Sequence, residues 1–230
     1  MTDLYDAAAF QAETGVSRET IARFERWRDL LAETNAHTNL VGRSTLEDFW
    51  FRHALDSWQI YQLAPRATRW ADLGAGAGFP GFAIAYGLMQ SGLPGAHVTL
   101  VESVQKKAQF LKAVAASTGA PVTVLPVRVE ALDEVPAVDV VTARAMAPLE
   151  TLLGYVHPFV EKGARALLPK GAKYREELTR ARKSWTFDLE VIPSRTSRDA
   201  AILSIRELAP CPQTAPRRRK SSPSPTRRGA

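Results

Sequence analysis

Residues 70–81 read Trp70-Ala71-Asp72-Leu73-Gly74-Ala75-Gly76-Ala77-Gly78-Phe79-Pro80-Gly81, and this stretch decides the fold. A short apolar run ends in an acidic residue, glycines recur at close intervals, and an apolar segment follows at 82–88. This order predicts a strand, a tight turn and a helix. Glycines permit close approaches that a Cβ atom blocks, so a flat adenosyl group can lie against the main chain of such a turn. The first hypothesis is therefore a nucleoside cofactor.

Two classes of cofactor compete for this turn. Residues Gly76 to Gly81 match the dinucleotide pattern G-x-G-x-x-G, and Glu102 lies 21 residues after Gly81, behind the apolar run 97–101. Asp72, however, precedes the glycines, and a carboxylate there repels a pyrophosphate but attracts the ammonium group of S-adenosylmethionine. Glu102 is expected to accept hydrogen bonds from ribose hydroxyls in both cases, so it does not separate them. The pattern favours S-adenosylmethionine over NAD.

The net charge of +6 is unevenly distributed along the chain. Residues 210–230 contain six basic residues and no acidic one, whereas residues 1–209 contain 24 basic and 24 acidic residues. The tail is rich in proline and serine, buries too little apolar surface to offset its ordering entropy, and is expected to be disordered. It either attracts RNA phosphates without sequence specificity or remains simply solvated.

Composition excludes several other classes of site. The single cysteine, Cys211, excludes an internal disulfide framework and a cysteine-rich zinc site, and His37, His97 and His157 lack metal-ligand spacing. The N-terminus lacks the basic region of a signal peptide, and no apolar run approaches the ~20 residues of a membrane span. We therefore expect a soluble, cytoplasmic monomer without a metal ion or a membrane contact.

Helical periodicity dominates the first 66 residues. Ser17 is a candidate N-cap for the apolar stripe that follows it, and Ser44 with Glu47 forms a capping box for a second helix that continues to Tyr61. Pro65 ends this layer. Three tryptophans in apolar patterns are expected in the core rather than as base-stacking platforms: Trp50, Trp58 and Trp70.

Strands and helices alternate from residue 67 onward. Strands are predicted at 69–73, 97–102, 121–125, 138–143 and 163–168, and helices after the glycine turn to about 90, at 104–118, near 130 and at 148–160. Two last apolar stretches, 188–192 and 200–205, predict a hairpin. Alternating units predict a parallel, doubly wound α/β sheet, into which the hairpin places one antiparallel strand. The predicted domains are a helical layer (1–66), a Rossmann-like unit (67–209) and the basic tail (210–230).

Six short motifs lie in a characteristic order. They are Asn39-Leu40, Arg52-His53-Ala54-Leu55-Asp56-Ser57, residues 72–81, Val129-Glu130, Arg144-Ala145 and Pro169-Lys170-Gly171. Their combination resembles the small-subunit (16S) ribosomal RNA guanine-N7 methyltransferases, the glucose-inhibited division protein B family. The resemblance implies the class I S-adenosylmethionine-dependent methyltransferase fold and, as partner, 16S ribosomal RNA or the small ribosomal subunit. It implies cofactor contacts from Gly74, Phe79, Val129, Glu130 and Arg144, to which the turn adds Asp72, Gly76, Gly78 and Glu102.

The chemistry of methyl transfer agrees with this resemblance. Transfer from a sulfonium is an in-line displacement, so the enzyme chiefly aligns donor and acceptor and excludes water. Methylation of an adenine amine commonly uses an Asn/Asp-Pro-Pro-aromatic run after the fourth strand, which is absent from residues 142–148. Methylation of pyrimidine carbon 5 needs a cysteine, and Cys211 lies at the start of the tail. Guanine N7 carries a free lone pair and needs neither the Pro-Pro-aromatic run nor a cysteine nucleophile.

Arg144 is assigned to the cofactor or to guanine O6, because a hydrogen bond to N7 would occupy the attacking lone pair. The competing interpretation is an ion pair with a neighbouring acid such as Glu150. No catalytic residue is identified, and the candidates for positioning the substrate are Arg52, His53, Asp56, Ser57 and Lys170. Arg52 and Asp56 share a helix face, so a surface ion pair competes with a role at the RNA entrance. Lys170 is either a phosphate contact or a solvated loop lysine.

Two other functions stay open. One is an NAD-dependent oxidoreductase that acts on a small molecule, and the other is a non-catalytic nucleotide- or RNA-binding module tethered by the basic tail. Asp72 and the terminal hairpin argue against the first, and the complete set of cofactor residues argues against the second.

Overall fold

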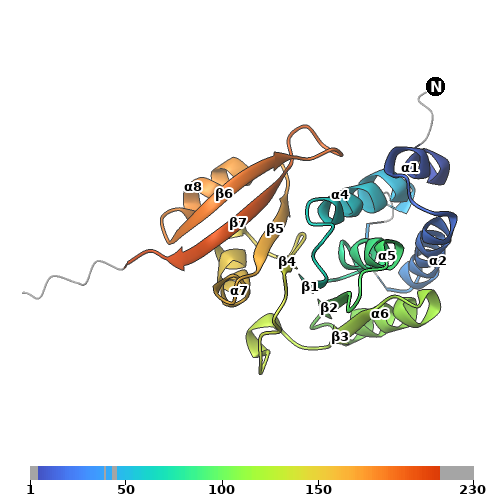
Figure 1. Cartoon of the computed structure of the whole chain (residues 1–230), viewed down its shortest axis with the longest axis horizontal. Coiled ribbons are helices and arrows are strands. Elements are labelled where there is room, and N and C mark those ends of the chain that lie inside the picture. Colours follow the sequence, from blue (N-terminus) through green and yellow to red (C-terminus); the bar gives the residue numbers. More distant parts are fainter. Residues whose placement is uncertain (1–4, 39, 43–45, 213–230) are drawn as a thin grey trace, which may run out of the picture.

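The computed structural model describes residues 5–38, 40–42 and 46–212. Its centre is a seven-stranded sheet in the order β3-β2-β1-β4-β5-β7-β6 (Figure 1). The strands are β1 (Arg69–Leu73), β2 (His97–Val101), β3 (Val122–Leu125), β4 (Val140–Thr142), β5 (Arg165–Lys170), β6 (Trp185–Pro193) and β7 (Ala201–Pro210). Strands β1 to β5 are parallel, and β7 runs antiparallel to both of its neighbours. The predicted α/β sheet with a C-terminal antiparallel hairpin is confirmed.

Helices cover both faces of the sheet. They are α1 (Ala7–Thr14), α2 (Arg18–Asn35), α4 (Asp56–Gln62), α5 (Gly81–Ser91), α6 (Gln105–Thr118), α7 (Leu149–Glu161) and α8 (Tyr174–Ala181), with the short segments η1 (Phe49–Leu55) and η2 (Val129–Ala131). Helices α7 and α8 lie on one side and the other five on the opposite side (Figure 1). Alternate strand residues feed the two cores, since Trp70 packs on the five-helix side and Ala71 on the other.

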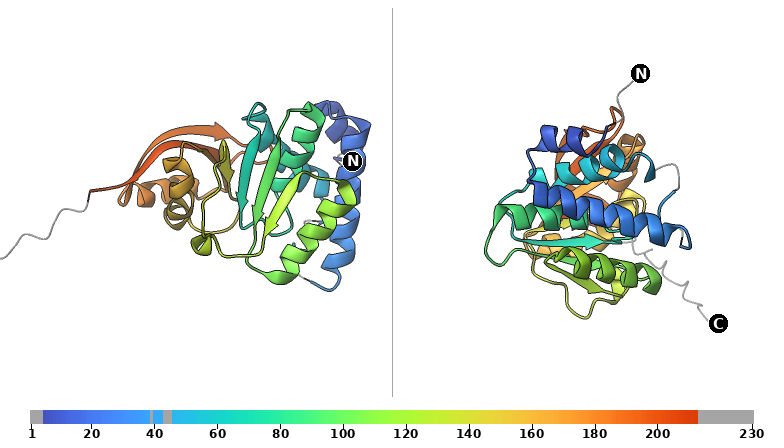
Figure 2. Two further views of the ribbon diagram at one scale, coloured as in Figure 1. Left: turned by 60° about the horizontal axis from the view of Figure 1, so that its bottom comes forward. Right: turned by 90° about the vertical axis from the view of Figure 1, so that its right-hand side faces the viewer.

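The N-terminal helices attach to the sheet through an aromatic core. Phe24 and Trp27 of α2 contact Tyr86 of α5 edge to face, with ring centroids 5.2 and 6.1 Å away. The Trp27 indole donates to the carbonyl oxygen of Ala77 at 3.0 Å, so α2 supports the glycine turn directly. Figure 2 shows α2 alongside α6 on this side of the molecule. Low exposure confirms three predicted core residues, Trp50 (7%), Trp58 (3%) and Trp70 (0%).

The second predicted helix differs from the observed one. Instead of a continuous α-helix, the chain forms the π-helical segment η1, and α4 begins at Asp56. A π-helix hydrogen-bonds five residues back, which widens the turn and changes which side chains share a face. Ser44 of the predicted capping box and Asn39 of the first motif lie outside the described residues. Ser17 caps α2 as predicted, because its Oγ accepts from Thr20 N at 3.2 Å.

Helices α1 and α8 are not among the elements predicted from the sequence. Among their side chains, α1 buries Phe10, and α8 buries Tyr174 and Ala181. Helix α1 therefore lacks the apolar stripe from which helical periodicity is recognised, whereas α8 has a short one formed by Tyr174, Leu178 and Ala181. Strand β7 ends at Pro210, five residues beyond the predicted end of the last strand at 205 and one beyond the predicted domain boundary at 209. Residues 213–230 of the tail lie outside the described chain.

Candidate active site

The turn between β1 and α5 depends on its glycines. Gly74, Gly76 and Gly78 have φ angles of +66°, +57° and +96°, in the left-handed region that side chains disfavour. A Cβ atom on Gly74 would lie 2.9 Å from Met146 Cγ, and one on Gly78 would lie 2.3 Å from Phe82 Cδ2. The turn therefore presents bare backbone at the carboxyl end of β1.

A cavity of about 540 Å³ opens beside this turn. It lies at the carboxyl ends of β1, β2 and β4, where the strand order reverses direction and where α/β sheets bind ligands. Its volume is in the range of cofactor sites. Seven of the predicted cofactor residues line it: Gly74, Gly76, Phe79, Glu102, Val129, Glu130 and Arg144.

Glu102 joins the end of β2 to the glycine turn. Its Oε2 accepts from Gly76 N at 2.9 Å, and its Oε1 accepts from Val104 N at 2.8 Å. A carboxylate oxygen can accept two hydrogen bonds, so each oxygen retains one position for a hydroxyl donor. The wall position of Glu102 therefore supports the predicted ribose contact, which stays a prediction.

Asp72 does not lie where the sequence predicts it. The residue is fully buried beneath the turn, its Oδ2 accepts from Gly81 N at 2.9 Å, and it is not among the residues that line the cavity. Burial raises the pKa of Asp72 to about 7, while the Gly81 hydrogen bond and Arg144 lower it and Glu102 raises it. Gly78 is likewise outside the cavity wall. In this geometry Asp72 holds the start of α5 instead of facing a ligand.

Asp72→Asn is expected to flatten the dependence of stability on pH. Because the pKa of folded Asp72 is raised to about 7, the folded chain keeps this proton at pH values where the unfolded chain has lost it. The free energy of unfolding should therefore fall by about 1.4 kcal/mol for each pH unit between about 4 and 7 in the native protein. Asparagine retains an oxygen for Gly81 N but does not titrate, so the variant should lose this slope.

Urea denaturation from pH 4.5 to 8 measures the difference. Asp199→Asn is the matched control, because it removes an exposed carboxylate from the loop before β7 and should retain the native profile. Equal slopes for native protein and Asp72→Asn would contradict the assignment of the titration to Asp72.

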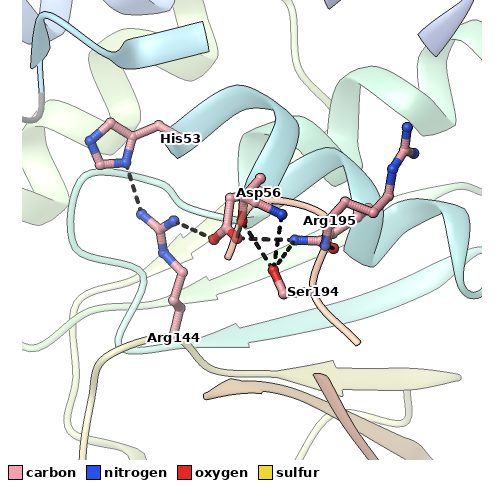
Figure 3. A network of polar contacts seen from close by, with 7 residues as sticks. His53, Asp56, Arg144, Ser194 and Arg195 are labelled. Atoms are coloured by element: carbon pink, nitrogen blue, oxygen red, sulfur yellow. Dashed lines mark hydrogen bonds and ion pairs between the residues drawn. The ribbon is translucent and has the colours of Figure 1, made fainter. Parts of the chain in front are cut away.

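A second group of polar residues converges beside the cavity (Figure 3). Arg144, in the loop after β4, donates from Nη1 to Asp56 Oδ2 at 3.0 Å, and its Nη2 lies 3.2 Å from His53 Nδ1. The guanidinium carbon lies 4.9 Å from the ring centroid of Phe79, on which the His53 ring stacks at 4.5 Å. A carboxylate, an imidazole and an aromatic face therefore hold the guanidinium in one place.

These contacts correct several expectations. Arg144 pairs with Asp56 instead of Glu150, and Asp56 does not pair with Arg52, whose side chain is exposed. The π-helical turn at η1 is one reason, because residues four apart do not stack there as in an α-helix. Ser57 is fully buried, its hydroxyl has no hydrogen-bond partner among the described residues, and it lines neither cavity of the site.

A second cavity, of about 380 Å³, adjoins the first. Arg144 and Ala145 line both cavities, so this arginine lies in their common wall. Lys170 also lines the second cavity, where its Nζ pairs with Glu177 at 2.7 Å and donates to a backbone carbonyl at 3.2 Å. A phosphate would compete with these partners, and the predicted phosphate contact of Lys170 stays a prediction.

Several residues of the site escape prediction from the sequence, and four of them are polar side chains in the cavity wall or on Asp56. Lys107 and Tyr155 line the first cavity, and Gln59 and Thr196 donate to Asp56. Gln59 has a local signal, because it lies three residues after Asp56 in the same helix. Thr196 has none, because it lies 140 positions away from Asp56 along the chain.

The described part of the chain contains no group of three or more His, Cys, Asp or Glu residues that could hold a metal ion. Within residues 5–38, 40–42 and 46–212, no helix has the length and apolar character needed to cross a membrane.

The sheet order and the glycine turn define a class of protein, the class I S-adenosylmethionine-dependent methyltransferases. The O-methyltransferase TomG from Streptomyces achromogenes, solved in complex with S-adenosylmethionine, gives a TM-score of 0.57 at 13% identity, over 90% of this chain and 99% of that one. An O-methyltransferase from Bacillus cereus, solved with S-adenosylhomocysteine, gives a TM-score of 0.57 at 12% identity, over 87% of this chain and 97% of that one. At such low identity these likenesses show the fold.

The chain belongs to the GidB family, rRNA small subunit methyltransferase G, whose family model matches residues 20–201. A ribosomal RNA small subunit methyltransferase G from Rhodospirillum centenum is 47% identical over 207 residues, which cover 90% of this chain and 93% of that protein. A protein of the same name from Caulobacter vibrioides is 45% identical over 204 residues, which cover 89% of this chain and 93% of that protein.

Family membership confirms the resemblance predicted from the motifs. It favours a methyltransferase over the two alternatives, an NAD-dependent oxidoreductase and a non-catalytic nucleotide- or RNA-binding module. Asp72 does not distinguish S-adenosylmethionine from NAD, because its carboxylate lies beneath the turn and is absent from the cavity wall. The antiparallel hairpin and the family match now distinguish this chain from a dehydrogenase.

Proposed function

We propose that the protein transfers a methyl group from S-adenosylmethionine to N7 of a guanine in 16S ribosomal RNA, acting as a cytoplasmic monomer. Relatives named ribosomal RNA small subunit methyltransferase G support the class of substrate. The observation that carries the proposal is the pair of adjoining cavities with Arg144 in their common wall. The larger cavity suits the cofactor, and the smaller suits a single base that has left its stack.

The first cavity offers what an adenosine-bearing cofactor needs. Gly74 leaves the main chain open to close approach, Glu102 supplies a carboxylate at the end of β2, and Val129 and Glu130 form another part of the wall. When bound, S-adenosylmethionine supplies a methyl group on a positively charged sulfur. The protein groups around it bind and orient the partners and exclude water.

The residues around Arg144 suit a transfer that needs no general base. Guanine N7 has a free lone pair, and the guanidinium of Arg144 offers hydrogen-bond donors but no acceptor. We assign it to the cofactor or to guanine O6, because a hydrogen bond to N7 would occupy the attacking pair. Asp56 and His53 hold the guanidinium in place, and Phe79 closes the wall beside it.

Affinity for RNA must come from local charge or from the tail, because residues 1–209 contain equal numbers of acidic and basic residues. Lys170 and Lys173 lie at the second cavity, where they can contact phosphates next to an inserted base. The remaining excess of positive charge lies in residues 213–230. We propose that this segment adds affinity without sequence specificity.

Deletion of residues 213–230 is expected to weaken RNA binding, most strongly at low salt, and to leave kcat near that of the native protein. The segment contains Arg217, Arg218, Arg219, Lys220, Arg227 and Arg228. The logarithm of the binding constant falls linearly with the logarithm of the salt concentration. If all six cations contact phosphates, their loss makes this negative slope shallower by about 5. A cut after Pro212 keeps the hydrogen bond from Cys211 N to Ser184 O.

Filter binding at several salt concentrations measures the slope. The control carries a neutral glycine-serine segment of equal length in place of the tail. An unchanged slope would indicate that the tail is only solvated.

The proposed function is tested by incubating the protein with S-adenosylmethionine labelled in its methyl group and with small ribosomal subunits that lack the modification. Deproteinised 16S RNA is the second substrate. We expect label in guanine, recovered as N7-methylguanine after depurination of the RNA. Label in adenine or in protein, or no transfer combined with tight binding of NAD, would overturn the proposal.

A further inference from the structure

The loop between β6 and β7 reaches the N-terminal helices beside the site (Figure 3). Arg195 N donates to Gln59 Oε1 at 3.0 Å, and the Arg195 guanidinium donates to Gln62 Oε1 at 2.8 Å and pairs with Glu13. Thr196 Oγ1 donates to Asp56 Oδ1 at 2.6 Å. The end of the hairpin is therefore tied to the helical layer at several points, and one of them is the carboxylate that holds Arg144.

Asp56 accepts hydrogen bonds on both of its oxygens. Its Oδ1 accepts from Thr196 Oγ1 at 2.6 Å and from Gln59 Nε2 at 3.0 Å, while its Oδ2 accepts from Arg144 Nη1 at 3.0 Å. Two donors on Oδ1 fix the rotation of the carboxylate plane and thereby aim Oδ2 at the guanidinium. The position of Arg144 in the common wall thus depends on Thr196 and Gln59, which act on it through Asp56.

We propose that Thr196 is a positioning residue for methyl transfer, which acts through Asp56 on Arg144. The inference rests on the proposed function of the two cavities. A partly exposed carboxylate with one donor fewer rotates more freely, and the guanidinium paired with it occupies a wider range of positions. Transfer requires the two reacting atoms to be held in line, so this loss of alignment lowers the rate more than it lowers binding.

The other contacts of the loop separate positioning from simple docking. Arg195 ties the loop to Gln59, Gln62 and Glu13 without using the hydroxyl of Thr196. Removal of this hydroxyl therefore leaves the loop attached to the helical layer. The change is confined to the donors of Asp56 and to a contact of 3.0 Å with Ser194 Oγ.

Thr196→Val is the first variant to measure, because it keeps the shape of the side chain and removes its hydroxyl. We expect kcat to fall about tenfold and the Kd for S-adenosylhomocysteine to change by less than about threefold. Thr196→Ser restores the donor and should recover kcat to within about twofold of the native value. Thr186→Val is the matched control, since it removes an exposed hydroxyl that donates to Ala209 O at the far end of the hairpin. Thr196→Ala replaces the valine variant if that variant does not fold.

A double-mutant cycle tests the route through Asp56 and Arg144. In an Arg144→Ala background, Thr196→Val should lower kcat no further, because the group that it positions is absent. Independent, multiplicative losses in the double variant would overturn the proposal. A fall in melting temperature that is matched by equal losses in kcat and in cofactor binding would also overturn it.

A readout without RNA separates this inference from the proposed function. In protein labelled with ¹⁵N-arginine, the guanidinium signal of Arg144, assigned with Arg144→Lys, should change in Thr196→Val and return in Thr196→Ser. An unchanged signal overturns the positioning role even if the native protein methylates RNA. A changed signal in a protein that transfers no methyl group to RNA supports the contact and overturns the proposed function instead.

Discussion

Arg144→Ala is expected to lower kcat/KM for methyl transfer by about 100-fold or more. The substitution removes a cation from the wall common to both cavities, where it is 19% exposed. It leaves the Asp56 carboxylate without its charged partner and uncovers the face of Phe79. Loss of a hydrogen-bonded charge at such a site costs more than loss of a surface ion pair, because the remaining partner is only partly solvated.

Two further variants control this experiment. Arg144→Lys keeps the charge but loses the fork that reaches Asp56 and His53 together, so its activity should lie between those of the alanine variant and the native protein. Arg28→Ala removes an exposed arginine that pairs with Asp29, and it should be indistinguishable from the native protein. If Arg144→Ala left both cofactor affinity and guanine methylation unchanged, the assignment of Arg144 to the site would be wrong.

Gly78→Ala is expected to lower the free energy of unfolding by about 3 kcal/mol or more. Two costs add at this position. The φ angle of +96° is unfavourable for any side chain, and the new Cβ would lie 2.3 Å from Phe82 Cδ2 and 3.3 Å from Leu111 Cδ2. Both neighbours are fully buried, so neither can move aside without opening the core of the five-helix side.

Gly76→Ala separates the two costs. Its φ angle of +57° is also left-handed, but the nearest atom to a new Cβ is the backbone oxygen of Gly74 at 3.8 Å. It should therefore lose only the conformational part, about 1 kcal/mol. Urea denaturation of both variants measures the difference. Equal losses in the two variants would show that the core around Phe82 yields and that the steric argument fails.

The elements of the fold that could be predicted are those with a local cause. The glycine turn after β1 follows from left-handed φ angles that glycine adopts most readily. The strands follow from short apolar runs, and the terminal hairpin from two such runs joined by a polar turn. Helix α1 could not be predicted, because it buries only Phe10 and has no apolar stripe, whereas the stripe of α8 is confined to three residues in a short, highly charged segment.

The sequence by itself determined the α/β fold, the place of the cofactor turn and the family, because backbone conformation and periodicity reside in neighbouring residues. Tertiary structure alone decided how the site's charges are arranged. It buried Asp72 beneath the turn, paired Arg144 with Asp56 from 88 positions away, and brought Thr196 to the same carboxylate from 140 positions away. Such contacts depend on how the end of the hairpin and the helical layer meet beside the sheet. A local sequence pattern cannot predict them, because the residues involved are far apart along the chain.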